Sequence, residues 1–121
     1  MTRRGFESDP LTNSAAGIAL VGAFGDEIGH ILRANQRLAD LLGTPLGALV
    51  GTRICRHVHS DNHGDAHVAF QRVMGSPETV YETKARLVAA NGRIVHVHAL
   101  ASAIRLRQGT AIVLRVLLLG E

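Results

Sequence analysis

Alternating apolar and polar stretches at the start of the chain predict a β-hairpin. The apolar run at residues 16–23 (AGIALVGA) is typical of a short buried strand. A Gly-Asp turn follows at 25–26, and residues 27–35 (EIGHILRAN) resume extended character. Two such segments around a short turn favour two antiparallel strands.

The hydrophobic period then changes to that of a helix. Leu38, Leu41 and Leu42 are spaced i, i+3, i+4, which places their side chains on one helical face. Asn35 is a natural N-cap before this stripe, and Gly43 is a natural stop after it. The pattern predicts a helix between these two residues.

Further helical segments fill the middle of the chain. Pro45 starts a short helical piece, because proline suits the first position of a helix. A longer helix is expected over about residues 62–74, with Ser60 and Asp61 as candidate caps. The Gly-Ser-Pro sequence at 75–77 ends it.

Three strand-like stretches close the chain, at residues 79–89, 93–104 and 110–119. The first two are joined through Asn91-Gly92, a pair that strongly favours a tight hairpin. The order of two strands, helices and three strands contains no βαβ crossover, so we expect an α+β fold with an antiparallel sheet.

The chain length and composition fit one small domain. With 121 residues, we assign residues 1–14 to a polar leader or linker and residues 15–120 to a single domain. Apolar residues make up 46% of the chain but aromatic residues only 3%. The core must therefore be built from aliphatic side chains and alanine, and a residual cavity for a small apolar ligand is expected.

Charge and cysteine content narrow the functional classes. The net charge is +3, but the arginines are scattered rather than clustered with aromatics, so no nucleic-acid partner is expected. No apolar stretch is long enough to span a bilayer, and no secretory signal is present. Cys55 is the single cysteine, which fits a reducing compartment and predicts a cytoplasmic protein.

Several short strings occur in the order and spacing of a known family. They are GIALV at 17–21, ILRAN at 31–35, LADLLG at 38–43, LVG at 49–51, HSDN at 59–62 and NGR at 91–93. Taken together, these strings resemble the PAS family of sensor domains over about residues 12–119. HSDN stands where members often carry His-Pro-Asp-Asp, and NGR where they usually carry an Asp-Gly-basic turn.

The resemblance implies both a fold and a role. It implies a PAS-like five-stranded antiparallel sheet with helices covering one face and enclosing a central cavity. It also implies a sensory or dimerisation module of a signal-transduction protein, attached to an output domain, that binds a small ligand or acts as a protein-interaction module. No catalytic motif is found, so we expect no enzyme activity from this chain.

A haem-binding gas or redox sensor is the alternative function. His63, His67, Phe70 and Met74 are spaced four, three and four apart, so they share one face of the predicted helix. In the PAS architecture this helix lines the cavity, and His67 lies close to the position of the haem ligand in oxygen-sensing members. Neutral imidazole suits haem iron as an axial ligand. His63 could serve as the ligand as well, and the opposing interpretation is that both histidines are solvated or hydrogen-bonded, so the sequence leaves the cofactor unknown.

Other candidate ligands give weaker signals. His96 and His98 alternate on one face of a predicted strand and could reach one metal, although solvent-exposed histidines are the simpler interpretation. A flavin adduct is not expected, because Cys55 lies four residues after Gly51, whereas flavin-binding PAS domains have three. Cys55 is instead expected to be a small, buried or half-buried hydrophobe.

The last strand supports self-association. Residues 111–119 (AIVLRVLLL) place hydrophobic side chains on both faces of the predicted sheet. One face packs on the core, and the other needs a partner. We expect a homodimer, formed through the sheet or through the N-terminal leader.

Overall fold

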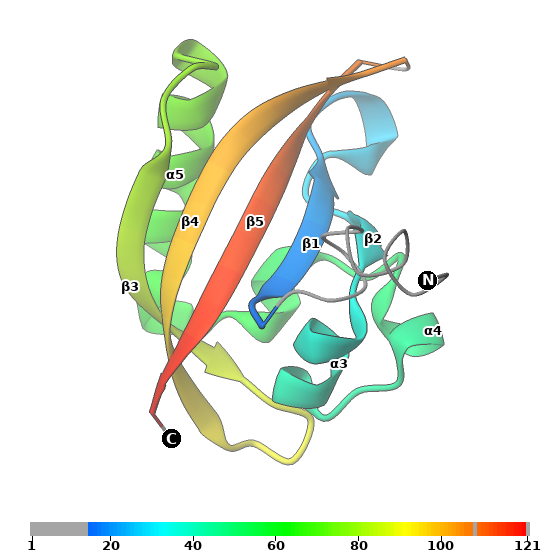
Figure 1. Cartoon of the computed structure of the whole chain (residues 1–121), viewed down its shortest axis with the longest axis vertical. Coiled ribbons are helices and arrows are strands. Elements are labelled where there is room, and N and C mark those ends of the chain that lie inside the picture. Colours follow the sequence, from blue (N-terminus) through cyan, green and yellow to red (C-terminus); the bar gives the residue numbers. More distant parts are fainter. Residues whose placement is uncertain (1–14, 108, 121) are drawn as a thin grey trace, which may run out of the picture.

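Five antiparallel strands form the sheet in the computed structural model, which describes residues 15–107 and 109–120. The strands are β1 (Gly17–Gly22), β2 (Ile31–Ala34), β3 (Tyr81–Val88), β4 (Ile94–Leu106) and β5 (Gly109–Gly120). They pair in the order β2-β1-β5-β4-β3, so β5 lies at the centre beside the first strand of the domain (Figure 1). The expected α+β fold with a five-stranded antiparallel sheet is confirmed. The expected leader at residues 1–14 lies outside the described residues.

The helices lie between β2 and β3 in the sequence. They are α3 (Gln36–Leu42), α4 (Leu46–Leu49) and α5 (His63–Gly75), with 3-10 turns η1 (Gly25–Glu27), η2 (Ile54–His57) and η3 (Ser60–Asn62). Figure 1 shows α5 running behind β3 and β4, so this helix covers one face of the sheet. Within the described ranges, none of the helices combines the length and the apolar character that crossing a bilayer requires.

The first hairpin has a longer connection than the sequence predicts. Residues 27–35 were expected to be extended, but β2 begins at Ile31, and η1 occupies part of the loop. The Gly29 N–H donates to the Gly22 carbonyl oxygen over 2.9 Å and closes this loop. Ile28, which contributed to the apolar pattern, is 47% exposed and packs on no core. The prediction was wrong here because a single apolar residue in a glycine-bounded loop imitates a strand.

The start of α3 is fixed by a buried asparagine. The Asn35 Oδ1 accepts hydrogen bonds from the Leu38 N–H at 3.0 Å and from the Ile18 N–H at 2.9 Å. Its Nδ2 donates to the Ala16 carbonyl oxygen at 2.9 Å. Gly43 ends the helix with φ 61°, a left-handed conformation that glycine adopts without strain. Both predicted ends of this helix are confirmed, and the cap also ties the helix to β1.

The start of α5 differs from the prediction. Ser60 and Asp61 were expected to cap it, but both lie in η3, and Asn62 occupies the N-cap position. The Asn62 side chain makes no capping hydrogen bond to the helix and turns to β3 instead. The 3-10 turn therefore replaces a side-chain cap, and the helix begins one or two residues later than the candidate caps imply.

The β3–β4 hairpin forms as the Asn-Gly pair predicts. Gly92 has φ 87°, and the Ala89 N–H donates to the Arg93 carbonyl oxygen at 2.9 Å. The Asn91 Oδ1 accepts from the Arg93 N–H at 2.9 Å, which closes the turn on itself. The turn fixes the register of β3 against β4, which pairs Ala85 with Val97.

Candidate functional site: a cavity between α5 and the sheet

A cavity of about 150 Å³ lies between α5, the segment around η2 and the inner face of the sheet. We define the inner face as the side of the sheet that carries the cavity walls, where Ala99 and Ala101 of β4 and Leu114 and Val116 of β5 point. The remaining lining residues are Val21, Gly29, Ile54, Cys55, Val58, Asn62, Asp65, Ala66, Ala69, Phe70, Tyr81, Thr83, Ala85, Leu87 and Ile112.

Small side chains on both walls create this cavity. Ala66 and Ala69 face it from α5, and Ala85, Ala99 and Ala101 face it from β3 and β4. A methyl group on each side cannot fill the space that close-packed interiors normally fill with longer aliphatic chains. The sparse aromatic content of the chain therefore leaves an unfilled space within the core.

The polar lining residues gather where the cavity meets solvent. Asp65 and Ala66 on the first turns of α5 are exposed, and so is Cys55 in η2, so the cavity opens between these two segments. Among the described lining residues, Asp65 is the one that carries a formal charge at neutral pH. The Thr83 hydroxyl on the opposite wall is engaged, since it donates to the Lys84 carbonyl oxygen over 3.3 Å.

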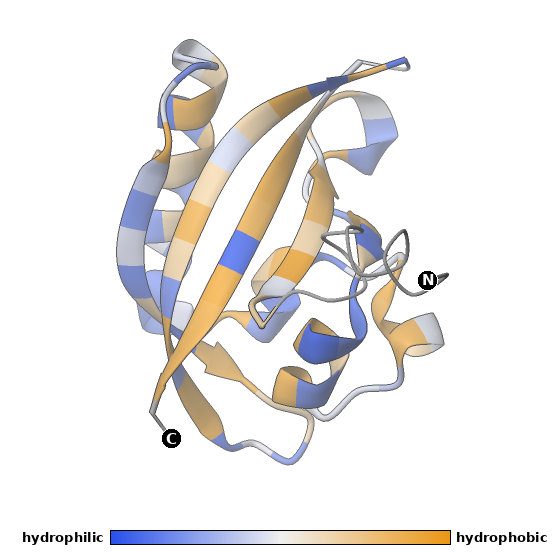
Figure 2. Cartoon of the chain, in the orientation of Figure 1, coloured by the Kyte–Doolittle hydropathy of each residue, from blue (hydrophilic) through white to orange (hydrophobic). Residues whose placement is uncertain are grey.

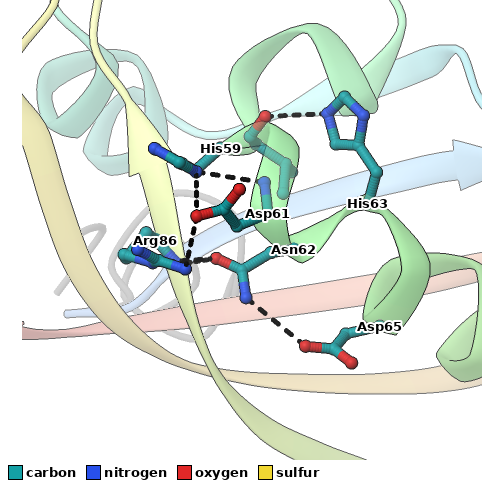
Figure 3. Close-up of polar contacts among 7 residues, drawn as sticks. His59, Asp61, Asn62, His63, Asp65 and Arg86 are labelled. Atoms are coloured by element: carbon teal, nitrogen blue, oxygen red, sulfur yellow. Dashed lines mark hydrogen bonds and ion pairs between the residues drawn. The ribbon is translucent and has the colours of Figure 1, made fainter.

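A set of polar contacts holds the start of α5 against the edge of the sheet (Figure 3). The Asn62 Oδ1 accepts from the backbone N–H of Arg86 at 3.1 Å and from its Nε at 3.2 Å. The guanidinium Nη2 of Arg86 lies 3.6 Å from the Asp61 Oδ2. Asn62 in turn donates through Nδ2 to the Asp65 Oδ2 at 3.4 Å. Asn62 and Asp65 at the cavity mouth are therefore positioned by β3.

The backbone contributes more to this junction than the ion pair does. The His59 N–H donates to the Arg86 carbonyl oxygen at 2.9 Å, and Val58 forms an isolated antiparallel bridge with Leu87. The side chain of Asp61 is 67% exposed, and ion pairs at such exposure contribute about 0–1 kcal/mol. The residues between η2 and η3 are thus paired with the end of β3 through their backbone.

The predicted site residues are distributed unevenly around the cavity. Phe70 lines it, as expected for a cavity-lining residue of the long helix. Met74 packs against the core cluster without reaching the lining. His67 is exposed and lies outside the lining, and the same holds for His63.

The His63 ring has a local structural role. Its Nε2 lies 3.0 Å from the Cys55 carbonyl oxygen and 2.9 Å from the Val58 carbonyl oxygen. Because both partners accept, the Nε2 carries a proton and donates to them. His63 thereby joins the first turn of α5 to the segment that forms the opposite side of the cavity mouth.

The inward face of α5 differs from the face that the histidines share. Ala66, Ala69 and Phe70 line the cavity, and Val73 is fully buried. Phe70 belongs to both stripes, this one and the one containing His63 and His67. The other members, Ala66, Ala69 and Val73, each lie one residue before a member of the histidine stripe, which corresponds to a rotation of about 100° on an α-helix. The inward stripe has the amphipathic spacing i, i+3, i+4, i+7, but the signal is weak, because two of its four members are alanines, which also suit exposed helix positions.

The geometry of these residues does not fit haem. An axial ligand must point its unprotonated nitrogen into a space that accepts the porphyrin. His67 is exposed outside the lining, and the Nε2 of His63 donates to two carbonyl oxygens. The cavity, at about 150 Å³, is also below the size of about 300–1,000 Å³ that is usual for cofactor sites.

The other candidate ligands are also spread apart. His98 lies 3.7 Å through its Nε2 from the Glu82 Oε1, on the face opposite to Ala99 and the cavity. His96 is exposed on β4. In the part of the chain that the structure describes, no three histidine, cysteine, aspartate or glutamate residues form a group that could hold a metal ion. Cys55 was expected to be buried or half-buried, but it is exposed, because it lies at the cavity mouth.

A buried histidine lies behind the cavity mouth, on the far side of η2. The His57 Nε2 is 2.9 Å from the Thr52 Oγ1, and the Thr52 hydroxyl donates to the Leu49 carbonyl oxygen at 2.6 Å. Since the hydroxyl has one proton, the His57 Nε2–H donates to it. Burial, and secondarily the charge of Arg56, lowers the pKa of His57 below its usual 6.5. The imidazole is therefore neutral at physiological pH.

Comparison with known proteins assigns a family to this architecture. A family model described as "PAS fold" matches residues 31–116. No curated protein matches the chain. Among solved structures, the PAS domain of an HTR-like protein from Haloarcula marismortui superposes with a TM-score of 0.79 at 17% identity, covering 98% of this chain and 92% of that one.

Two further solved structures superpose over most of their length. The PAS domain of nitrogen regulation protein NR(II) from Vibrio parahaemolyticus gives a TM-score of 0.74 at 12% identity, covering 91% of this chain and 94% of that one. A domain of a sensory box sensor histidine kinase/response regulator from Geobacter sulfurreducens gives 0.70 at 16% identity, covering 94% and 92%. At such identities the structural likeness establishes the fold.

Proposed function

The chain belongs to the PAS fold family, and on this basis we propose that it is the sensory module of a signal-transduction protein, which binds a small ligand in the cavity beneath α5. The cavity carries the proposal, because it lies within the core of the domain and is bounded by nearly every strand. A ligand there contacts α5 and the inner face of the sheet at the same time, so its binding changes the packing between them.

The test is to fill the cavity. We expect Ala69→Leu to place its side chain into the space between α5 and the sheet and to abolish the binding of small apolar molecules. Gln71→Leu is the matched control, since residue 71 is exposed on the same helix and outside the lining. Binding is measured by chemical shifts of ¹³C-labelled alanine methyl groups, five of which line the cavity. If Ala69→Leu binds as the parent protein does, the ligand occupies another place.

An absorption spectrum separates this function from the haem alternative. We expect the purified protein, with and without added haemin, to show no sharp Soret band, because neither His67 nor His63 points an acceptor nitrogen into the cavity. A stoichiometric Soret band that is lost in His67→Ala would instead establish a haem sensor. A Soret band that persists in His67→Ala would show that another residue is the axial ligand.

The second part of the proposal is a homodimer formed through the outer face of the sheet, which we define as the side opposite to the cavity. Figure 2 colours β5 as apolar over most of its length, and Arg115 is the charged residue within it. On the outer face, Leu117 is 40% exposed and Leu119 is 55% exposed, while Leu100 of the neighbouring strand is half-buried. A second copy of the chain would cover these leucines.

The mass of the protein in solution tests the dimer. We expect light scattering at micromolar concentration to give twice the chain mass, and Leu117→Lys to give one chain mass. Val68→Lys is the control, since Val68 is equally exposed at 40% but lies on α5, away from the outer face. A single-chain mass for the parent protein would overturn the dimer and leave the cavity proposal unaffected.

The sensory role requires an output domain to which the cavity state is transmitted. Sensor histidine kinases are one class of protein in which a domain of this fold is found, as the Geobacter sulfurreducens structure illustrates. This chain contributes the sensing step and no catalytic step to such a protein. The cytoplasm is the proposed compartment, because a lone cysteine is suited to reducing conditions.

A further inference from the structure

The cavity has a size that limits its ligand to a small molecule. Its volume of about 150 Å³ is close to that of engineered apolar cavities that stay dry and bind benzene. Five of the residues that line this volume are alanines, whose methyl groups cannot retract to admit a larger body. The apolar body of the ligand is therefore a single six-membered ring or a short branched chain.

The polar groups at the opening select the head group of that ligand. The Asp65 side chain is exposed at the mouth. The guanidinium of Arg86 is held by Asp61 and Asn62, so its charge is already opposed by a carboxylate. An anionic head group at this mouth would meet the Asp65 carboxylate, whereas a hydroxyl or ammonium group could donate a hydrogen bond to it.

The interior gives an anion no alternative position. The lining beyond the mouth is almost entirely apolar: it consists of aliphatic side chains and the rings of Phe70 and Tyr81, and the hydroxyl of Thr83 already donates to a backbone carbonyl. Moving a carboxylate from water into such surroundings is strongly unfavourable without a compensating donor. The cavity therefore rejects anions in both orientations.

From these observations we infer that the cavity is selective for small uncharged or cationic molecules with an apolar body of about benzene size and one hydrogen-bond donor, and that Asp65 excludes carboxylates and phosphates. This inference rests on the proposed function, since it specifies the ligand class of the same cavity. It assigns Asp65 as the residue that determines specificity for the head group.

Three probes with the same body test the inference. Benzyl alcohol, benzylamine and benzoate share a ring and differ in the charge of the head group. Each is titrated into the full chain, and the ¹³C methyl shifts of Ala69 and Ala99 report cavity binding. We expect benzyl alcohol and benzylamine to shift these methyl groups, and benzoate to bind at least about tenfold more weakly than benzyl alcohol.

Asp65→Asn separates the charge from the shape. It keeps the side-chain size and removes the carboxylate, so benzoate binding should strengthen by about fivefold or more and benzylamine binding should weaken. Asp40→Asn is the control with the same chemical change on α3, where the carboxylate accepts a hydrogen bond from Gln36 away from the cavity. It should leave all three affinities unchanged.

The possible outcomes distinguish the inference from the function on which it rests. Equal binding of benzoate and benzyl alcohol in the parent protein, lost in Ala69→Leu, would overturn the head-group selectivity while supporting the cavity as a binding site. An unchanged benzoate affinity in Asp65→Asn would overturn the role of that residue. Binding of none of the three probes at millimolar concentration would overturn both the ligand class and the cavity function.

Discussion

The helices α3 and α5 pack against the same sheet in opposite ways. α3 has 7 residues and buries Leu38, Ala39 and Leu42 to 2% exposure or less. α5 has 13 described residues, and Val73 is the one among them that is fully buried. The shorter helix thus anchors the fold, whereas the longer helix covers a cavity.

This difference follows from the residues that face the sheet. α3 presents leucines against β1, and its first turn is tied to β1 through the hydrogen bonds of Asn35. α5 presents Ala66 and Ala69 over the cavity, where strands β3 and β4 also present alanines. Stability is concentrated at the α3 end, and unfilled space at the α5 end. A ligand can therefore change the packing of α5 without competing against the main core.

The largest expected effect is the loss of a leucine from α3. Leu42→Ala should lower the free energy of unfolding by about 3 kcal/mol, because it opens a new cavity where the side chain is 1% exposed. Met74→Ala on α5 should cost about 1 kcal/mol, since Met74 is only half-buried at the margin of the core. Urea denaturation monitored by circular dichroism measures both. Equal losses would mean that the two helices are packed alike.

A pair of asparagines gives the next largest contrast. Asn35→Ala should destabilise the domain by about 2 kcal/mol, because it removes the helix cap and leaves the buried N–H of Ile18 without its acceptor. Asn62→Ala, at the start of α5, should cost about 1 kcal/mol or less, since its partners are only partly buried. Thermal melts of the two variants measure the difference. A larger loss for Asn62→Ala would place the main anchor at α5.

These two asparagines also show what the sequence could predict. The cap at Asn35 was predicted correctly because its acceptor geometry depends on residues three positions away, and the leucine stripe that follows fixes the helix face. The start of α5 was misassigned because the capping role there is replaced by contacts with β3, which is 24 residues away in the sequence. Local patterns cannot report a partner at that separation.

The candidate site was predictable in outline and not in its walls. The small core residues indicated a cavity, and Phe70 is the one of the four candidate residues on α5 that lines the cavity described here. His63 and His67 were chosen because imidazole can bind haem iron, whereas Ala66 and Ala69 mark the face of α5 that points into the cavity. Alanine carries little signal because it is compatible with both buried and exposed helix positions. Which side of α5 meets the sheet is settled by tertiary packing.

Adding volume should again destabilise the protein more at α3 than at α5. Ala39→Leu on α3 should destabilise by about 2 kcal/mol, because residue 39 is 1% exposed in a filled core. Ala69→Leu on α5 should change the free energy of unfolding by less than about 1 kcal/mol and could raise it, because the new side chain enters existing space. Both are measured by urea denaturation. Comparable destabilisation by the two leucines would show that the cavity is not open to a side chain.

The smallest expected effect is a pH dependence that originates at His57, on the segment that forms one side of the cavity mouth. Burial lowers the pKa of His57 in the folded protein, so the unfolded chain binds its proton first as the pH falls through the usual value of 6.5. Stability is therefore unaffected by this group at higher pH and decreases as the pH falls from 6.5 towards the folded pKa. The imidazole keeps its Nε2 proton when it is protonated, so the hydrogen bond to Thr52 survives and the loss reflects the buried charge beside Arg56.

The measurement is the free energy of unfolding at about pH 7.5 and about pH 5.5, with an expected loss below about 1 kcal/mol from this residue. His57→Gln keeps a hydrogen-bond donor without a titrating group and should flatten the profile by that amount. His67→Gln, at an exposed position of α5, should leave the profile unchanged. If the free energy of unfolding falls with pH equally in the parent protein and in His57→Gln, other groups cause the acid sensitivity. The segment around η2 would then respond to the ligand alone.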